Sequence, residues 1–236
     1  MRALLLAAGI GSRLRPLTET VPKCLVTIHD RPLLDYWMDL LFDAGFERAL
    51  VNTHWLAEKV MAHLSISKWR DRIDTVHEDE LLGTGGTILA NRAYFEGAPF
   101  LVAHADNLTD FDVKALVAAH AERPKGCAIT MLAFKTDDPR SCGILELDRA
   151  GLVQAFHEKV ENPPGDLANA AVYIIEPEVV SFIVGLGRPV VDLSTEVIPH
   201  FVGRILAVET KGYHRDIGNL RSLDQARKDF PLPKQR

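Results

Sequence analysis

Apolar and polar positions follow two different periods along the first half of the chain. Apolar runs of strand length occur at residues 3–8, 48–52, 72–77, 99–103 and 127–134, and segments with helical apolar spacing lie between them at 32–45, 55–64, 84–94 and 112–121. Strands that alternate with helices of this length indicate right-handed βαβ crossovers. We therefore predict an α/β fold with a Rossmann-like, mostly parallel sheet that is flanked by helices.

The pattern changes after residue 140. Short strand patterns follow one another at 143–148, 153–158 and 169–175, and this spacing favours antiparallel pairing. We interpret them as a small antiparallel insertion lobe that covers one end of the sheet. Helical segments at 177–185, 194–202 and 219–230 and a strand at 205–209 close the domain, and the tail from Phe230 is predicted to fray.

Composition narrows the class of protein. The chain has 236 residues, 47% of them hydrophobic, which suits one α/β domain with a proper core. Its net charge of −5 does not favour nucleic-acid binding. The N-terminal apolar run is too short for a membrane span and lacks a signal-peptide layout. The three cysteines, Cys24, Cys127 and Cys142, have no metal-ligand spacing and are expected to be reduced thiols. We expect a cytoplasmic protein.

The loop after the first apolar run carries the strongest candidate chemistry. Gly9-Ile-Gly11-Ser12 interrupts the run, and Arg13, Arg15 and Lys23 follow. Small residues let backbone N–H groups approach an anion closely, and the cations add charge. No Gly-Lys-Ser/Thr ends the loop, and Leu14 stands where a dinucleotide fingerprint needs its third glycine. On this fragment alone, a structural βα turn stays an alternative to a phosphate-binding loop.

Asp106 is a candidate metal ligand. It follows the apolar run at 99–103, and Mg²⁺ prefers a few carboxylates together with phosphate oxygens and water. A turn or helix-capping aspartate is the alternative. In doubly wound sheets, ligands bind at the carboxyl ends of the strands. We therefore expect the glycine loop, Asp106 and the segment 78–87 to converge on one edge.

The N-terminal stretch resembles the signature of the sugar-1-phosphate nucleotidyltransferases. It reads Leu-Ala-Ala-Gly-x-Gly-Ser-Arg-Leu-x-Pro-Leu-Thr, followed by Pro-Lys-x-Leu. Further stretches match in the family's order: Glu78 with Leu82-Gly-Thr84, Ala105-Asp106, Phe156-His-Glu158-Lys159, Asn169 with Tyr173, and Asp216-Ile-Gly218. The resemblance implies the nucleotide-diphospho-sugar transferase fold as a single domain over 1–236. Residues of about 1–135 would form the nucleotide-binding half and residues of about 140–236 the sugar-phosphate-binding half.

The resemblance also implies a nucleotide site. Its residues would be Ala7, Ala8, Gly9, Gly11, Ser12, Arg13, Lys23, Glu78, Gly83 and Thr84. Among them, Arg13 and Lys23 would be catalytic, with Arg13 gripping the leaving pyrophosphate and Lys23 neutralising the α-phosphate. Gly83 would let the base approach the backbone. Glu78 could accept hydrogen bonds from N1–H and N2–H₂ of guanine, a donor pair that uracil lacks, which favours GTP. An adjacent backbone carbonyl could do the same work.

The remaining matches imply the metal and sugar-phosphate sites. Asp106 and Asp216 would bind Mg²⁺, and Glu158, Lys159 and Asn169 would bind the sugar phosphate. The sequence departs from the family pattern in several places, which leave the role of His104 and the shape of the sugar pocket open. These departures are His104, Val160, Ala170 or Ala171, Tyr213 or His214, and Asn219.

The implied reaction is transfer of a nucleoside monophosphate from an NTP, with GTP favoured, to a mannose- or manno-heptose-type sugar 1-phosphate. The products would be an NDP-sugar and pyrophosphate, as in nucleotide-sugar biosynthesis for cell envelope polysaccharide. Uridylyl transfer to an amino-sugar 1-phosphate such as N-acetylmuramate 1-phosphate, cytidylyl transfer to phosphocholine, and a catalytically inactive regulatory protein stay open. A nicotinamide-dependent oxidoreductase is disfavoured because Asn52, not an acidic residue, ends the second strand.

The expected partners are thus an NTP and a sugar 1-phosphate, without nucleic acid or membrane. A homo-oligomer stays open, because Trp37, Trp55 and Trp69 suit either a core or an interface.

Overall fold

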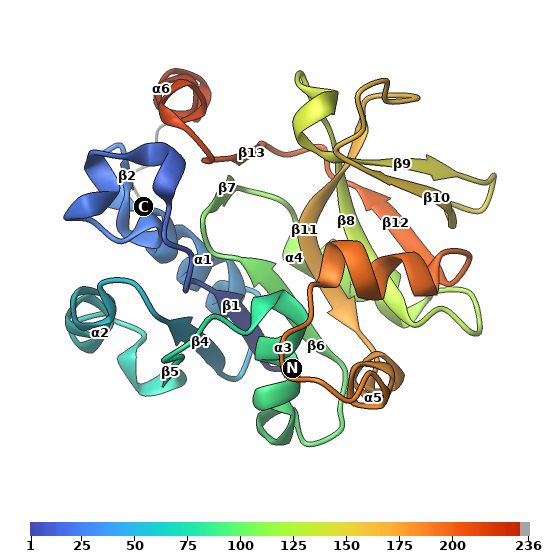
Figure 1. Ribbon diagram of the computed structural model, residues 1–236, viewed down its shortest axis with the longest axis horizontal. Helices are drawn as coiled ribbons and strands as arrows, with labels where there is room; N and C mark the ends of the chain where they lie inside the picture. The colour runs from blue at the N-terminus through green and yellow to red at the C-terminus, as the bar shows by residue number, and fades with distance from the viewer. Residues whose placement is uncertain (232–236) are drawn as a thin grey trace.

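A nine-stranded mixed sheet forms the centre of the protein, whose computed structural model describes residues 1–231 (Figure 1). In spatial order, the sheet runs β10 (Val153–Glu158), β9 (Gly143–Leu147), β11 (Leu167–Ile175), β6 (Phe100–His104), β1 (Ala3–Leu6), β4 (Ala49–Thr53) and β5 (Ile73–His77). In addition, β8 (Ile129–Lys135) pairs with β11, and β12 (Ile205–Glu209) pairs with β8. The ladders that join β6, β1, β4 and β5 are parallel, and β11 runs antiparallel to β6 and β8. The predicted α/β class is confirmed.

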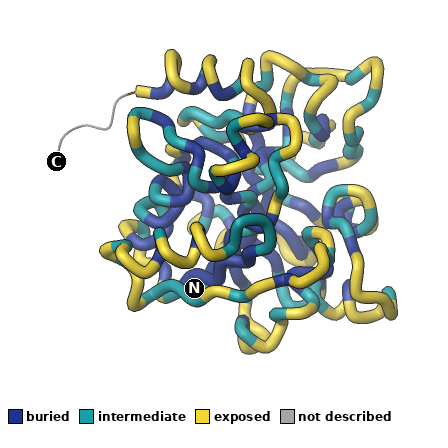
Figure 2. Tube along the Cα trace, turned by 60° about the vertical axis from the view of Figure 1, so that its left-hand side comes forward, coloured by how far each residue is buried: buried dark blue, intermediate teal, exposed yellow. Residues whose placement is uncertain are grey.

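Helices cover both faces of this sheet. They are α1 (Leu33–Asp43), α2 (Ala57–Ser65), α3 (Gly83–Ala90), α4 (Val113–Ala121) and α5 (Pro177–Gly185). A sixth helix, α6 (Leu220–Asp229), packs away from this sheet, where Leu223 lies in one cluster with Leu14 and Ile28. Successive strand residues point to opposite faces. Leu5 of β1 accordingly packs with Trp37 of α1 in one core cluster, and Leu4 packs with Ile88 of α3 and Ile183 of α5 in another. Burial on both faces explains why β1 is a continuous apolar run. Figure 2 shows buried residues in the interior of the trace and exposed ones around it.

The predicted antiparallel strands are present, and they continue the central sheet. β9 pairs with both β10 and β11. The pairing of β11 with β8 shifts register between Asn169 and Tyr173, and Ala171 in this interval has φ +53°. A positive φ favours glycine, so Ala171 rather than Ala170 occupies the strained position.

Two small sheets lie outside the central one. β7 (Asn107–Thr109) pairs with β13 (His214–Asp216), and β2 (Thr27–Ile28) pairs with β3 (Arg31–Pro32). Figure 1 shows β13 crossing between α6 and the strands β9 and β10. The register pairs Asp216 with Asn107, and Asn107 directly follows Asp106. This pairing brings two chain segments that are far apart in sequence to one place.

Two expectations for the C-terminal part need correction. The segment predicted as a helix at 194–202 is a π-helical turn, Leu193–Val197, followed by a 3₁₀ turn, Ile198–Phe201, since Pro199 has no N–H to continue a regular ladder. The chain is anchored, not frayed, at Phe230, which is 6% exposed and packs edge-on against Tyr36. The rest of the predicted frayed tail, at 232–236, lies outside the described residues. Within the described part, no helix is long and apolar enough to span a membrane.

Candidate active site

The two glycines of the N-terminal loop serve different purposes. Gly11 has φ +67°, and a Cβ there would lie 2.9 Å from Cγ2 of Thr18. Thr18 is buried, and its hydroxyl donates to the Gly11 carbonyl at 2.7 Å. Glycine at this position is therefore required by the loop's own packing. A Cβ on Gly9 would meet nothing within 4 Å, so the space beside Gly9 is open to a ligand.

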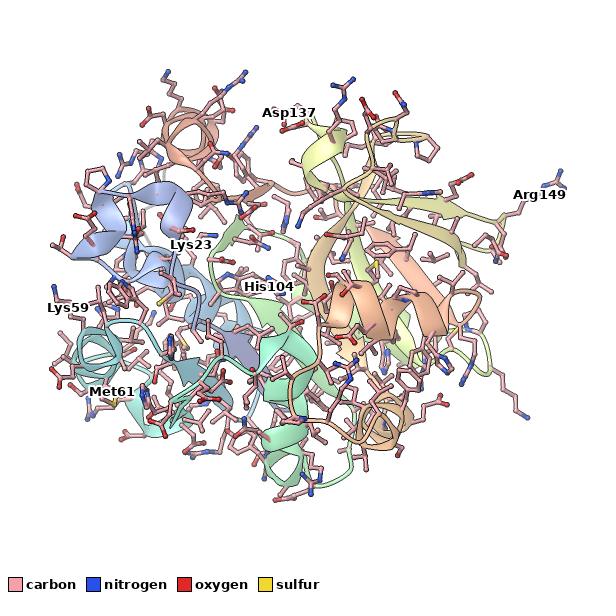
Figure 3. All side chains as sticks on the ribbon, viewed as in Figure 1. Lys23, Lys59, Met61, His104, Asp137 and Arg149 are labelled. Atoms are coloured by element: carbon pink, nitrogen blue, oxygen red, sulfur yellow. The ribbon has the colours of Figure 1, made fainter. Side chains whose placement is uncertain are left out.

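Lys23 joins the two aspartates that the sequence singles out. Its Nζ lies 2.5 Å from Oδ2 of Asp106 and 3.5 Å from Oδ1 of Asp216. The Lys23 side chain is 9% exposed, the Asp106 side chain 23% and the Asp216 side chain 53%. In Figure 3, His104 lies near the centre of the view and Lys23 lies to its left, and both side chains lower the pKa of Asp106. The structure thus brings together residues 23, 106 and 216.

Burial and ion pairing oppose each other at this pair. Burial of Asp106 favours its neutral form, but the charges of Lys23 and His104 and the hydrogen bond from Lys23 outweigh burial and hold its pKa below the ordinary value. Burial likewise disfavours the charged form of Lys23, but Asp106 and Asp216 raise its pKa above the ordinary value. Lys23 and Asp106 therefore form an ion pair at neutral pH.

Arg13 reaches the same place from the exposed side of the loop. A Cβ on Gly218 would lie 2.8 Å from Oδ2 of Asp216 and 3.2 Å from Nη2 of Arg13. The glycine of Asp216-Ile-Gly218 therefore leaves room for the carboxylate and the guanidinium to pass over the backbone. Arg13 also opposes protonation of Lys23, as expected for two neighbouring cations.

The donor set of this cluster fits a magnesium ion that is shared with substrate. Within the described residues, no group of three or more histidine, cysteine or acidic side chains could form a metal cage. Mg²⁺ is usually bound by one or two carboxylates with substrate phosphates and water. Asp106 and Asp216 supply two carboxylates that already face one cation, the Lys23 ammonium.

Glu78 is buried in a polar network at the end of β5. Its Oε1 accepts from Nδ2 of Asn52 at 3.0 Å and from the hydroxyl of Thr87 at 2.6 Å. Oδ1 of Asn52 accepts from the backbone N–H of Ala7 at 2.7 Å. Hydrogen bonds therefore link Ala7, which follows β1, to Asn52 in β4, and through Glu78 to Thr87 in α3. The N–H of Ala7 is engaged within the protein, whereas the neighbouring Ala8 contributes a short apolar side chain that is 6% exposed.

The glycines that open α3 pack against the segment 189–193. A Cβ on Gly83, whose φ is +72°, would lie 2.6 Å from the carbonyl oxygen of Val191. That oxygen accepts from the N–H groups of Gly85 and Gly86 at 2.8 and 3.0 Å. The hydroxyl of Thr84 accepts from the N–H of Leu193 at 2.7 Å. Backbone packing thus requires the glycines, and this helix start donates to protein instead of to phosphate.

Glu158 and Lys159 adjoin the end of β10. Nζ of Lys159 lies 3.1 Å from Oε1 of Glu158, and the Lys159 side chain is 63% exposed. Lys159 has φ +50°, a strained backbone for a lysine. A Cβ on Gly143 would lie 2.6 Å from Oε2 of Glu158, so this glycine makes space for the carboxylate.

Asn169 shapes the irregular part of β11. Its Nδ2 donates to the hydroxyl of Tyr173 at 2.7 Å, and its Oδ1 accepts from the N–H of Ala171 at 2.9 Å. Both polar ends of the side chain are therefore used to hold the bulge. Burial raises the pKa of Tyr173, against the hydrogen bond from Asn169, and the charge of Glu158 raises it further.

The sequence matches the nucleotidyl transferase family over residues 2–231. The chain belongs to this family. It is 31% identical over 223 residues to mannose-1-phosphate guanylyltransferase catalytic subunit beta of Drosophila pseudoobscura pseudoobscura, a match that covers 92% of this chain and 59% of the relative. The chain thus spans about three fifths of the length of the curated relatives it matches.

Solved structures share the fold of this nucleotidyl transferase. HddC from Yersinia pseudotuberculosis superposes with a TM-score of 0.81 at 25% identity over 98% of this chain and 99% of its own, and it has also been solved in complex with GMP-PN. A Bacillus anthracis protein in complex with a sucrose superposes with a TM-score of 0.88 at 20% identity, over 99% of this chain and 98% of that one, which shows the fold alone.

Several residues that shape this nucleotidyl transferase site were not expected from the sequence. Asn52 and Thr87 anchor Glu78, and Trp55, in the turn before α2, donates from Nε1 to the Thr18 carbonyl at 2.9 Å, which braces the loop. Val191 fixes the start of α3. Asn52 carried a signal, because an asparagine that ends an apolar run is a buried polar group that requires partners.

The tryptophans are satisfied within the chain. Nε1 of Trp37 donates to the Asn107 carbonyl, and Nε1 of Trp69 donates to Oδ1 of Asp39. Trp37 is fully buried in the core. The three tryptophans therefore support the fold and the loop.

Proposed function

We propose that the protein transfers a nucleoside monophosphate from an NTP to a sugar 1-phosphate, releasing pyrophosphate. The observation that carries this proposal is the contact of buried Lys23 with both Asp106 and Asp216, with Arg13 beside them. Two carboxylates, two cations and an open space beside Gly9 suit a bound triphosphate. Residues of about 1–135 would hold the NTP, and residues of about 140–236 the sugar phosphate.

The chemistry needs positioning and charge neutralisation. An oxygen of the sugar phosphate attacks the α-phosphorus of the NTP in line, and the bond from that phosphorus to the leaving pyrophosphate breaks. The attacking oxygen is already an anion, so no general base is required. Catalysis would come from bringing polyanions together and from stabilising charge at the α-phosphate.

Each half of the site would contribute cations. Lys23 would neutralise the α-phosphate, Arg13 the leaving pyrophosphate and Lys159 the sugar phosphate. The backbone of Gly9, Gly11 and Ser12 would cradle phosphates. Asp106 and Asp216 would hold a magnesium ion, which when bound neutralises phosphate oxygens.

Glu158 and Asn169 would shape the sugar end of the site. The carboxylate of Glu158 can accept hydrogen bonds from sugar hydroxyls. Asn169 would act through the bulge of β11, because both of its polar atoms are engaged there. Thr84 and Gly83 would act on the base in the same indirect way, by fixing the loop on Val191.

We infer that GTP and a mannose- or manno-heptose-type 1-phosphate are the substrates. This choice is supported by the guanylyltransferase names of the relatives and by the GMP-PN complex of HddC. Glu78 supports it less than the sequence suggested, because Asn52 and Thr87 occupy one of its two oxygens. That observation equally favours the second candidate, uridylyl transfer to an amino-sugar 1-phosphate, since uracil also carries one imino N–H.

A matrix of substrates tests the proposal. Purified protein is mixed with each of GTP, UTP, CTP and dTTP and with a panel of sugar 1-phosphates in the presence of Mg²⁺, and pyrophosphate release is measured. We expect the highest kcat/KM with GTP and a manno-configured 1-phosphate. UTP with an amino-sugar 1-phosphate as the best pair would establish the second candidate. No release with any pair would indicate an inactive regulatory protein.

A further inference from the structure

We propose that Asn52 and Thr87 are positioning residues that leave Glu78 one free carboxylate oxygen, and that this oxygen selects bases that carry an imino N–H. The inference rests on the proposed function, in which Glu78 faces the base of the NTP. Beyond that function, it names the group of the base that Glu78 would bind, the imino N–H, and the residues that position the Glu78 carboxylate.

The geometry saturates one oxygen of Glu78. Oε1 accepts from Asn52 at 3.0 Å and from Thr87 at 2.6 Å, which uses both of its lone pairs. Within residues 1–231, Oε2 receives one contact, a long one of 3.5 Å from the N–H of Leu82. Oε2 is therefore the acceptor that a base can use.

Burial makes this arrangement rigid. Asn52 and Thr87 are each 2% exposed and Glu78 is 6% exposed. The Asn52 amide has one acceptable orientation, because its oxygen accepts from Ala7 N–H while its NH₂ donates to Glu78. A flipped amide would place its NH₂ against the N–H of Ala7, and its oxygen against the carboxylate of Glu78. The carboxylate of Glu78 is thus held from two sides, by an amide of fixed orientation and by the buried Thr87 hydroxyl.

The hydrogen-bond network also connects Glu78 to the glycine loop that would bind the phosphates. Ala7 directly follows β1 and precedes Gly9, and Thr87 lies in α3. The Thr87 hydroxyl has one proton, and Glu78 at 2.6 Å is nearer than the Gly83 carbonyl at 3.1 Å. The position of the Glu78 carboxylate is therefore fixed by the segment after β1 and by α3, the two segments that would border the NTP.

One free acceptor has a definite chemical preference. Guanine N1–H and uracil or thymine N3–H can each donate one hydrogen bond to Oε2. Adenine N1 and cytosine N3 carry lone pairs instead, which would face the carboxylate and leave it unpaired in a buried place. Sites of this kind reject the analogue that lacks the donor strongly. The 2-amino group of guanine is not required by this arrangement.

Binding measurements on wild type and four variants test the inference. Dissociation constants are measured for GTP, ITP, ATP, UTP and CTP by titration calorimetry. ITP keeps N1–H and lacks the 2-amino group. For wild type we expect ITP to bind within about fivefold of GTP, and ATP and CTP to bind at least about 100-fold more weakly than their imino counterparts.

The variants separate positioning from folding. Asn52→Leu and Thr87→Val should each lower the GTP/ATP and UTP/CTP selectivity by about tenfold or more, and should raise KM more than they lower kcat. Thr87→Ser keeps the hydroxyl and should restore selectivity, which a loss of packing alone would not predict. Thr130→Val is the matched control, because it removes another buried threonine hydroxyl, one that contacts His120.

The outcomes distinguish the two levels of the proposal. Wild type that binds neither GTP nor UTP refutes the proposed function. Wild type that binds one of them, together with unchanged selectivity in folded Asn52→Leu or Thr87→Val, refutes this inference alone. ITP bound about 100-fold more weakly than GTP also refutes it, because the 2-amino group would then be read. If Asn52→Leu does not fold, the pair Thr87→Val and Thr87→Ser decides.

Discussion

The ammonium of Lys23 lies 2.5 Å from a carboxylate oxygen of Asp106, and both side chains are largely shielded from water. Such a pair is stabilised by its own charges as long as both partners are present. Without Lys23, the carboxylates of Asp106 and Asp216 would face each other across the same space. Lys23 therefore has two roles in the proposal, which are to hold the carboxylates and to meet the α-phosphate.

Lys23→Met should lower kcat by about 10²–10³-fold, because one positioned cation is removed from the transition state. It should also lower the melting temperature, since Asp106 is left buried without its partner. Turnover is measured by pyrophosphate release and folding by circular dichroism. Lys135→Met is the matched control, because it removes an exposed lysine that also pairs with one aspartate, Asp166. Wild-type kcat in Lys23→Met would contradict the proposed role.

Arg13 should separate activity from stability. Arg13 is exposed on the loop, and no carboxylate pairs with its guanidinium within the described residues. Arg13→Ala should therefore leave the melting temperature within about 1–2 °C of wild type while it lowers kcat by about 10²-fold. Arg15→Ala changes a second exposed arginine of the same loop and serves as the comparison. Equal losses in both variants would assign the effect to loop charge in general.

The metal prediction tests Asp106 and Asp216 together. EDTA should abolish pyrophosphate release, and excess Mg²⁺ should restore it. Asp106→Asn and Asp216→Asn should each raise the Mg²⁺ concentration that gives half-maximal rate by about tenfold or more, because each removes one anionic ligand. Asp110→Asn is the control, since its carboxylate accepts from the N–H of Tyr213 outside the cluster. Rates that are indifferent to EDTA would remove the magnesium model.

The start of α3 offers a stability test with a matched control. A Cβ on Gly86 would lie 2.2 Å from the carbonyl oxygen of Pro189, whereas a Cβ on Gly185 in α5 would meet nothing within 4 Å. Gly86→Ala should thus destabilise the protein by about 1–3 kcal/mol through overpacking. Gly185→Ala should be neutral or stabilise by up to about 1 kcal/mol. Urea unfolding of both variants checks the difference. Equal changes in the free energy of unfolding would mean that segment 189–193 is not packed tightly against α3.

The predictable part of this site follows from sheet geometry. The glycine loop and Asp106 follow β1 and β6, which are adjacent and parallel, so their carboxyl ends had to meet. Asp216 could be placed only by resemblance. It lies in β13, a three-residue strand of polar composition, His-Arg-Asp, that has no apolar alternation to identify it.

Other features depend on contacts that no local pattern contains. The glycines of Gly83-Thr-Gly-Gly86 suggest a flexible or ligand-facing turn, and their actual reason is Val191, more than a hundred residues later. Glu78 suggests a free acceptor pair, and its partners Asn52 and Thr87 come from another strand and a helix. Long-range packing of this kind is invisible to periodicity.

His214 lies two residues before Asp216 on β13. Burial lowers the pKa of His214 to about 3 from an ordinary 6.5, and its Nδ1 has no hydrogen-bond partner within the described residues. The ring packs against Phe134 with centroids 4.4 Å apart. The folded protein therefore keeps this imidazole neutral at pH values where the unfolded chain protonates it.

The sign of the resulting pH dependence is fixed. Stability is unaffected by His214 above pH 6.5, and it falls as pH decreases from 6.5 towards 3, because only the unfolded state binds the proton. His214→Phe should keep the ring contact with Phe134 and reduce the slope of the unfolding free energy between pH 6 and 4 by up to about 1.4 kcal/mol per pH unit. Urea unfolding at several pH values gives both slopes. His200→Phe, which changes an exposed histidine, should leave the slope as in wild type. Identical slopes in wild type and His214→Phe would mean that water reaches this imidazole and that the strand carrying Asp216 opens readily.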